Sequence, residues 1–302
     1  MMFALDAVLD AVPRFAGRAR QVAELSGGLT NRNFRVSTDE GDFVARVSPL
    51  GADVLAIDRT HEYANSVIAA AAGVGAPVLD FLPDQGVMVV GYIDGVTFTD
   101  AHLSLPGNLE RVAQSCRRLH GGDRFVNDFD MFEISRNYLS LVQERGFRLP
   151  AGYLDFLPQV ADLQRAMAVG DEGTVPCNND LLAGNFVDDQ QQIWLIDYEY
   201  SGNNDACFEL GNIWSECHLS LEQLAALVGD YYGRSRPSRF ARAQLQGLMS
   251  KYGWTLWASI QHATSDLDFD FWSWGMEKYD GAVEMFRSPA LPRLLEDVQQ
   301  KD

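Results

Sequence analysis

The sequence predicts an α+β protein with two lobes, a small β-rich lobe at residues 1–92 and a larger, mainly helical lobe at residues 93–302. Apolar and polar side chains alternate on either side of "TDEGD", residues 38–42, which is typical of a β-hairpin. The apolar run "GVMVVGYIDG", residues 86–95, begins and ends at glycine and fits a buried strand. No repeat, low-complexity tract or Gly/Ser linker is present, so we expect the lobes to meet at a tight hinge near Tyr92.

The elements of the small lobe have local signals. Phe34 and Val36 alternate with polar neighbours in one strand of the hairpin, and Val44 and Arg46 do so in the other. The next segment, "DRTHEYANSVIAAAAGVGAP", predicts a helix with Asp58 as its N-cap. Four apolar residues lie at helical spacing in it: Ala64, Val67, Ile68 and Ala71.

Composition limits the class of protein. The 302 residues are 47% hydrophobic and 22% charged, which is typical of a soluble globular chain. No apolar run approaches the roughly 20 residues that span a bilayer. The opening residues predict an amphipathic helix ended by Pro13. Asp6 and Asp10 interrupt its apolar residues, which argues against a signal peptide. We therefore expect a cytoplasmic protein without a membrane partner.

Charge and cysteine spacing exclude further classes. A net charge of −18 argues against a nucleic-acid partner, which requires basic patches, and is compatible with a small cationic substrate. The four cysteines are far apart in the chain and form no CxxC pair, so we expect reduced, mostly buried thiols rather than disulfides or a zinc site. They are Cys116, Cys177, Cys207 and Cys217.

A glycine-rich turn precedes the hairpin. In "SGGLTN", residues 26–31, glycines allow close approach of the backbone to a ligand and can direct N–H groups at phosphate. A simple tight turn is the alternative. Arg46 on the following strand is suited to polyphosphate oxygens, and Glu62 on the next helix is expected to orient it. The backbone of the strand that ends near Tyr92 is available to an adenine edge. The candidate nucleotide-binding residues are Gly27, Gly28, Thr30, Asn31, Arg46, Glu62 and Tyr92.

Acidic and amide side chains surround a second short hairpin in "CNNDLLAGNFVDDQQQIWLIDYEY", residues 177–200. We expect strands at residues 186–187 and 194–197, with "DDQQQ" as the turn. Antiparallel pairing brings Asn185 and Asp197 side by side at the open end, and Asp180 reaches the same place from the preceding loop. These oxygen ligands suit Mg²⁺ that bridges nucleotide phosphates. The spacing of the three residues matches a kinase catalytic loop, whereas the alternative is a polar hairpin without function.

Together these motifs are similar to those of the choline/ethanolamine kinases, within the aminoglycoside phosphotransferase-like kinases. The resemblance spans nearly the whole chain. Its motifs are "GGLTNRNF", "FVARV", "DRTHEYAN", "LH" at residues 119–120, "NNDLLAGNF", "WLIDYEY", "FELGN" and "WTLWASIQ". The resemblance implies a bilobal protein-kinase-like fold and the cofactors ATP and Mg²⁺.

The resemblance also implies residue roles. Asp180 would be the catalytic base, Asn185 and Asp197 the metal ligands, and Arg46 the phosphate-binding partner of Glu62. Glu199 is expected on the face of Asp197 by strand alternation, supporting the metal, and Asp205 and Glu209 are expected to brace the catalytic loop. One departure is Asn178, where the family has His.

The C-terminal third holds the expected substrate pocket. Trp254 and Trp257 share a helix face, and with Trp274 they would form an aromatic wall for an ammonium group through cation–π attraction. Glu216 resembles the acidic residue that faces the cation in choline kinases. Core packing is the alternative for the tryptophans, and an exposed helix charge is the alternative for Glu216.

The expected reaction is phosphorylation of choline or a related amino-alcohol by Mg-ATP. Two other functions stay open: a kinase for another small metabolite, such as an aminoglycoside or thiamine, and a pseudokinase that binds without turnover. The oligomeric state is also open, with a homodimer as one option.

Overall fold

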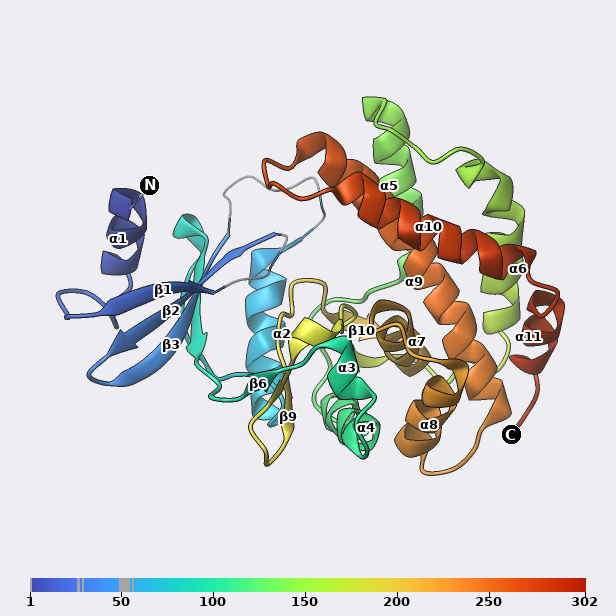
Figure 1. Cartoon of the computed structure of the whole chain (residues 1–302), viewed down its shortest axis with the longest axis horizontal. Helices are drawn as coiled ribbons and strands as arrows, with labels where there is room; N and C mark the ends of the chain where they lie inside the picture. The colour runs from blue at the N-terminus through green and yellow to red at the C-terminus, as the bar shows by residue number, and fades with distance from the viewer. Residues whose placement is uncertain (1, 26–27, 29, 49–54, 56) are drawn as a thin grey trace.

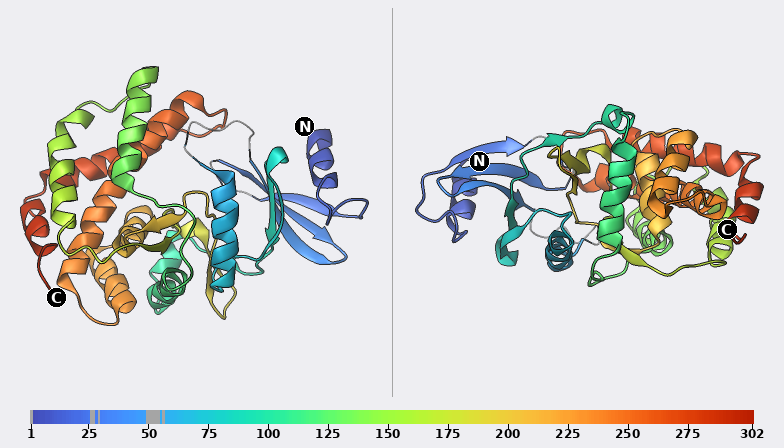
Figure 2. Two further views of the ribbon diagram at one scale, coloured as in Figure 1. Left: turned by 180° about the vertical axis from the view of Figure 1, so that it is seen from behind. Right: turned by 90° about the horizontal axis from the view of Figure 1, so that it is seen from below.

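The computed structural model describes residues 2–25, 28, 30–48, 55 and 57–302. Figure 1 shows a small lobe that contains a β-sheet beside a larger lobe built mostly of helices. Seen from below, the molecule is elongated along the line that joins the two lobes (Figure 2). Among the described residues, no helix is both long and apolar enough to cross a membrane.

The small lobe is built on a five-stranded antiparallel sheet with the strand order β1-β2-β3-β5-β4. Its strands are β1 (Gln21–Leu25), β2 (Arg32–Thr38), β3 (Gly41–Val47), β4 (Val78–Leu82) and β5 (Val87–Gly91). The predicted hairpin is confirmed, with Phe34 opposite Ala45 and Val36 opposite Phe43. These side chains are buried against residues that follow the N-terminal helix α1 (Met2–Asp10), including Val12 and Phe15.

Helix α2 (Arg59–Ala71) begins as predicted but buries a different face. Asp58 caps it by accepting hydrogen bonds from the backbone N–H groups of Thr60 and His61. The residues at helical spacing are not the buried ones, because Val67 is 42% exposed. The buried residues are Glu62, Asn65, Ser66 and Ala69. Asn65 donates to Asn127 and to Ser201 in the large lobe, so polar contacts rather than an apolar stripe fix this helix.

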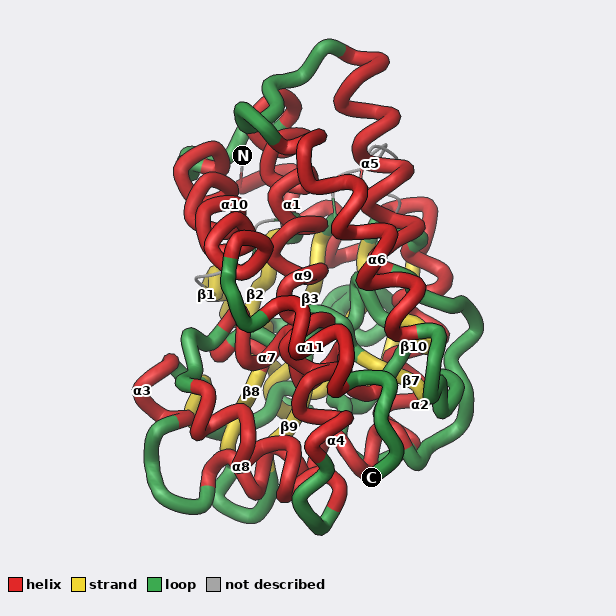
Figure 3. Tube along the Cα trace, turned by 90° about the vertical axis from the view of Figure 1, so that its right-hand side faces the viewer, coloured by secondary structure: helices red, strands yellow, loops and turns green. Residues whose placement is uncertain are grey.

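The large lobe surrounds the long helix α9. Its helices are α3 (Asp100–Leu103), α4 (Asn108–His120), α5 (Met131–Arg145), α6 (Leu157–Met167), α7 (Ala206–Glu216), α8 (Leu221–Tyr232), α9 (Pro237–Thr264), α10 (Phe271–Arg287) and α11 (Leu291–Asp297). Helix α9 is buried along most of its 28 residues. Helices α5, α6, α8 and α11 contact it, and the strands of the small lobe lie behind these helices in Figure 3. Helices α7 and α10 pack directly on α9.

Short strands of the large lobe carry the loops that face the small lobe. They are β6 (Val96–Thr97), β7 (Val175–Cys177), β8 (Phe186–Asp188), β9 (Ile193–Leu195) and β10 (Gly202–Asn204). Strands β6, β8 and β9 form one sheet, and β7 pairs with β10. Strand β5 ends at Gly91, and we retain residues 1–92 and 93–302 as the proposed limits of the lobes.

The cysteines contribute to the core. All four are buried and free of disulfide bonds, which confirms that part of the prediction. Burial raises the pKa of every one of these thiols, so they are held in the protonated form. Cys116, Cys207 and Cys217 pack within the hydrophobic core, whereas the Cys177 thiol lies 3.6 Å from the imidazole of His120.

Candidate active site

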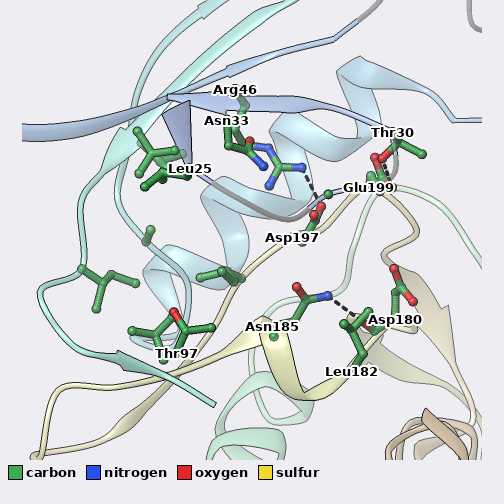
Figure 4. A pocket seen from close by; sticks show the side chains of 18 of the residues that line it. Leu25, Thr30, Asn33, Arg46, Thr97, Asp180, Leu182, Asn185, Asp197 and Glu199 are labelled. Carbon is green, nitrogen blue, oxygen red and sulfur yellow. Dashed lines mark hydrogen bonds and ion pairs between the residues drawn. The ribbon is translucent and has the colours of Figure 1, made fainter. Parts of the chain in front are cut away.

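A cavity of about 520 Å³ lies between the two lobes. Its wall combines side chains from the small sheet with others from the β8–β9 hairpin and the loops beside it (Figure 4). Residues of α7, α9 and α10 complete the wall. The predicted residues that line it are Gly28, Thr30, Arg46, Tyr92, Asp180, Asn185, Asp197, Glu216, Trp254, Trp257 and Trp274. Asn31 and Glu62 contact lining residues from behind. Gly27 lies outside the described residues.

The β8–β9 hairpin positions Asn185 and Asp197 as predicted. Phe186 pairs with Leu195, and the N–H of Ile196 donates to the carbonyl of Asn185 at 3.0 Å, so Asn185 and Asp197 adjoin. The second strand ends at Leu195, earlier than expected. Asp197 has a φ of 63°, a left-handed backbone conformation that residues other than glycine seldom adopt. This local backbone turn directs the Asp197 carboxylate into the cavity (Figure 4).

Asp180 faces the same space from the loop that precedes the hairpin. The amide nitrogen of Asn185 donates to the Asp180 carbonyl at 2.7 Å, which fixes the loop against the hairpin (Figure 4). Desolvation raises the pKa of Asp180 well above its usual range, and the nearby carboxylates of Glu216 and Asp197 add to this rise. The Asp180 carboxyl group therefore lies in an acidic, poorly hydrated part of the cavity.

Two side chains fix the Asp180 loop through hydrogen bonds to backbone groups. Glu209 is fully buried and accepts the backbone N–H groups of Asn178 and Asn179 at 2.8 and 2.7 Å, which confirms its predicted bracing role. The Asn178 amide donates to the carbonyls of Ile196 and Asp197 and accepts the N–H of Asp180. The residue that departs from the family pattern therefore links the loop to the hairpin through hydrogen bonds.

The prediction for Asp205 is wrong. Asp205 caps helix α7 through the N–H of Cys207, and its other oxygen accepts from Arg242 and Gln246 on α9. Its side chain therefore ties α7 to α9, and the hydrogen bonds found for that side chain among the described residues go to Cys207, Arg242 and Gln246 rather than to the catalytic loop. The chain position next to the first turn of a helix favours capping, and an arginine one helix away completes the contact.

Arg46 connects the two lobes. Its guanidinium lies 3.0 Å from a Glu62 oxygen, which confirms the predicted pair, and 2.5 Å from Oδ1 of Asp197. Glu62 also pairs with Arg59 at 2.7 Å. Arg46 and Glu62 are both buried, so each charge needs such a partner. One guanidinium thus orients an acidic side chain from each lobe.

Glu199 contacts the glycine-rich turn. It accepts hydrogen bonds from Thr30 at 2.6 Å and Asn31 at 2.9 Å, and it pairs with Arg59. The expected neighbourhood of Glu199 and Asp197 is present, because both line the cavity, but strand alternation is the wrong reason for it, since the strand ends at Leu195. Desolvation, together with Asp197 and Glu62, raises the pKa of Glu199.

An aromatic wall closes the opposite part of the cavity. Trp254 and Trp257 come from α9, and Trp274 from α10 packs edge-on to Trp257 with ring centroids 5.4 Å apart. The Trp257 N–H donates to the Tyr200 hydroxyl at 2.6 Å, and the Tyr200 ring packs against Trp254. Tyr200 lines the cavity but was not predicted, because nothing in the stretch "YEY" distinguishes this tyrosine from one that packs in the core.

Glu216 ends helix α7 beside this wall and already has a cationic partner. The Lys278 ammonium lies 2.7 and 2.5 Å from the two Glu216 oxygens and 4.1 Å from the centroid of the Trp274 ring. Sequence reasoning missed Lys278. The available signal was its spacing of four residues from Trp274, which places both on one helix face.

The donor atoms suit a divalent metal ion. Arg46 pairs with Oδ1 of Asp197, and the Asn185 amide nitrogen donates to the Asp180 carbonyl. Within the described part of the chain, this leaves Oδ2 of Asp197 and the amide oxygen of Asn185 for a cation. Carboxylate and amide oxygens are ligands that Mg²⁺ prefers. The residues present therefore fit the metal that the sequence predicts.

The two lobes, the hairpin with its carboxylates and the acidic loop define a kinase of small molecules with the protein-kinase-like fold, as predicted. A sequence model of the choline/ethanolamine kinase family matches residues 22–228. The chain belongs to the choline/ethanolamine kinase family.

Individual relatives agree with this assignment. Protein LicA of Haemophilus influenzae is 26% identical over 275 residues, which covers 86% of this chain and 78% of LicA. The crystal structure of a choline/ethanolamine kinase family protein from Mesorhizobium loti is 32% identical, with a TM-score of 0.87 over 99% of both chains. Choline kinase LicA from Streptococcus pneumoniae shares the fold, with a TM-score of 0.80 at 21% identity over 94% of this chain and 98% of its own.

Proposed function

We propose that this protein transfers the γ-phosphoryl group of Mg-ATP to the hydroxyl group of a small cationic alcohol, choline or ethanolamine. One observation carries the proposal: a single cavity is lined by Asp180, Asn185 and Asp197 and also by the tryptophan wall with Glu216. The first group suits phosphoryl transfer, and the second suits an ammonium head group.

Each residue of the first group has a distinct proposed role. Asp180 accepts the proton of the substrate hydroxyl. Asn185 and Asp197 would hold Mg²⁺, which neutralises phosphate charge when bound. Arg46 binds phosphate oxygens, and its ion pair with Glu62 holds the guanidinium group in position. Catalysis then comes mainly from positioning and charge neutralisation, because phosphoryl transfer requires little covalent work from the protein.

The nucleotide is proposed to lie under the small sheet. Gly28, Thr30 and Tyr92 line this part of the cavity, and Asn31 supports it. Gly27 belongs to the same proposed turn. A solved structure with this fold, LicA in complex with AMP, has a TM-score of 0.76, which supports an adenine nucleotide as the cofactor.

The proposed function is tested by ADP release from Mg-ATP by the purified protein with choline, with ethanolamine and with buffer alone, beside Asp180→Ala. We expect stimulation by at least one alcohol and its loss in the variant. Nucleotide binding without phosphorylated product from either alcohol would contradict the proposal and favour a pseudokinase. Stimulation only by thiamine or an aminoglycoside would keep the reaction and replace the substrate.

Replacing Asn178 with Ala is expected to lower kcat about ten- to a hundredfold, since partners of metal ligands commonly contribute this much. The change removes the bonds that fix the Asp197 backbone and the Asp180 N–H. Steady-state kinetics at varied Mg²⁺ concentration measure the fall in kcat. The Mg²⁺ concentration that gives half-maximal activity is expected to rise as well. A variant with unchanged kcat and unchanged Mg²⁺ dependence would show that these bonds are dispensable.

A further inference from the structure

The ammonium group of Lys278 lies where the proposed function places the ammonium group of the substrate. It contacts both Glu216 oxygens and the face of Trp274, the same carboxylate and one of the same rings. We propose that Lys278 is an internal occupant of this ammonium site, so that a cationic alcohol binds by displacing it. This inference rests on the proposed function and makes Lys278 a residue that determines specificity.

Burial explains why the site is filled. The side chains of Glu216 and Lys278 are only 8% and 10% exposed. A carboxylate so far from water is costly unless a cation and hydrogen bonds compensate it. Lys278 supplies both, and the Trp274 ring adds a cation–π contact. An arriving cation therefore meets a carboxylate whose two oxygens are already paired.

The choice of lysine is unusual in this chain. Of 24 basic residues other than histidine, 21 are arginine and three are lysine: Lys251, Lys278 and Lys301. An ammonium group is a compact charge on a flexible stem, whereas guanidinium is a wide planar fork. Lysine is thus the side chain that both resembles a small amine substrate and can withdraw from the site.

The exchange favours one kind of substrate. Lys278 donates two N–H hydrogen bonds to Glu216. A primary ammonium such as that of ethanolamine can replace these bonds when it displaces the lysine, whereas the quaternary ammonium of choline has no N–H group to donate. Displacement therefore costs choline hydrogen bonds that ethanolamine recovers. Lys278 is expected to bias the wild-type protein toward the primary amine.

The decisive probe is tetramethylammonium, which has the charge of the head group but no hydroxyl group to phosphorylate. Calorimetric titration at constant ionic strength is expected to show at least tenfold tighter binding by Lys278→Met than by the wild type. Lys278→Arg keeps a cation beside Glu216 and is expected to bind as weakly as the wild type. The double variant Lys278→Met/Glu216→Gln lacks the anion and is expected to lose the gain. Equal affinity of the wild type and Lys278→Met would overturn the proposal.

A measurement on the wild type avoids dependence on the folding of the variants. With three lysines, ¹⁵N-detected side-chain NMR gives few ammonium signals, and comparison with Lys278→Arg assigns one of them. Titration with tetramethylammonium is expected to shift the Lys278 signal and leave that of exposed Lys301 unchanged. A Lys278 signal that stays in place at saturation would show that the cation binds elsewhere.

Kinetics separate this inference from the proposed function. The ratio of kcat/KM for choline to that for ethanolamine is expected to rise at least tenfold in Lys278→Met, and a ratio is insensitive to general loss of active protein. If no alcohol is phosphorylated but tetramethylammonium binds more tightly to the variant, the proposed function fails and the displacement stands. If turnover occurs and neither the probe affinity nor the ratio changes, the displacement fails alone.

Discussion

Replacing Asp180 with Asn is expected to lower kcat by roughly 10²- to 10⁴-fold, the range that general base catalysis commonly contributes. The amide has nearly the shape of the carboxylate but cannot accept the hydroxyl proton. The loop is expected to stay in place, because the two hydrogen bonds of Asp180 to Asn178 and Asn185 use its backbone. Steady-state ADP release and thermal unfolding, measured on the same preparation, test both statements.

Asp123→Asn is the matched control, since it removes one carboxylate at an exposed loop position. We expect its kcat and unfolding temperature to equal those of the wild type. Nucleotide affinity is expected to change little in Asp180→Asn, because the residue faces the acceptor hydroxyl in the proposed reaction. A loss of kcat below about tenfold would assign the proton to another acceptor.

Gly211→Ala is expected to destabilise the large lobe by about 3 kcal/mol, at the upper end of the usual cost of overpacking. A Cβ at Gly211 would overlap the carbonyl oxygen of Ala243 and lie 2.7 Å from the backbone nitrogen of Gly247, both on α9. Backbone atoms cannot move aside as a flexible side chain does. We expect the apparent Tm to fall by roughly 5–10 °C. Activity is expected to fall with it, because α7 carries Glu209 and Glu216.

Gly229→Ala provides the control with the opposite sign. Gly229 lies within helix α8, and a Cβ there would meet no atom within 4 Å. Alanine favours the helix by about 0.5–1 kcal/mol over glycine, so this variant is expected to be slightly more stable. Scanning calorimetry measures the apparent Tm of both variants beside that of the wild type. Equal Tm values of the two variants would show that helices α7 and α9 can move apart to accommodate the added methyl group without loss of stability.

Features determined by neighbouring residues were predictable from sequence. The β2–β3 hairpin follows from alternation around a turn, and the Asp58 cap follows from its position before a helix. The adjacency of Asn185 and Asp197 follows from one short hairpin. In each case the interacting groups are at most fifteen residues apart, so local rules of pairing and capping suffice.

Features that depend on distant contacts, and that no family motif carries, were not predictable. Lys278 and Glu216 are 62 residues apart, and the bonds of Asn65 reach Ser201, 136 residues away. Periodicity finds an apolar face and cannot find a buried polar one, which explains the error on α2. Asp205 shows the same limit, because its arginine partner belongs to a helix later in the chain. The roles of the site residues remain predictions that the variants above test.

Helix α9 has a consequence for how the pocket can change. At about 1.5 Å per residue, its 28 residues form a rod of roughly 42 Å, and Trp254 and Trp257 lie well inside it with neighbours on nearly every side. Because both tryptophans belong to the core of the large lobe, we expect substitutions there to destabilise that lobe. Helix α10 is shorter and partly exposed, with Trp274 and Lys278 on the face it turns inward. One wall of the pocket therefore lies on a helix buried along most of its length and the other on a helix with an exposed face, so we expect substitutions on α10 to alter the pocket with a smaller loss of stability than substitutions on α9.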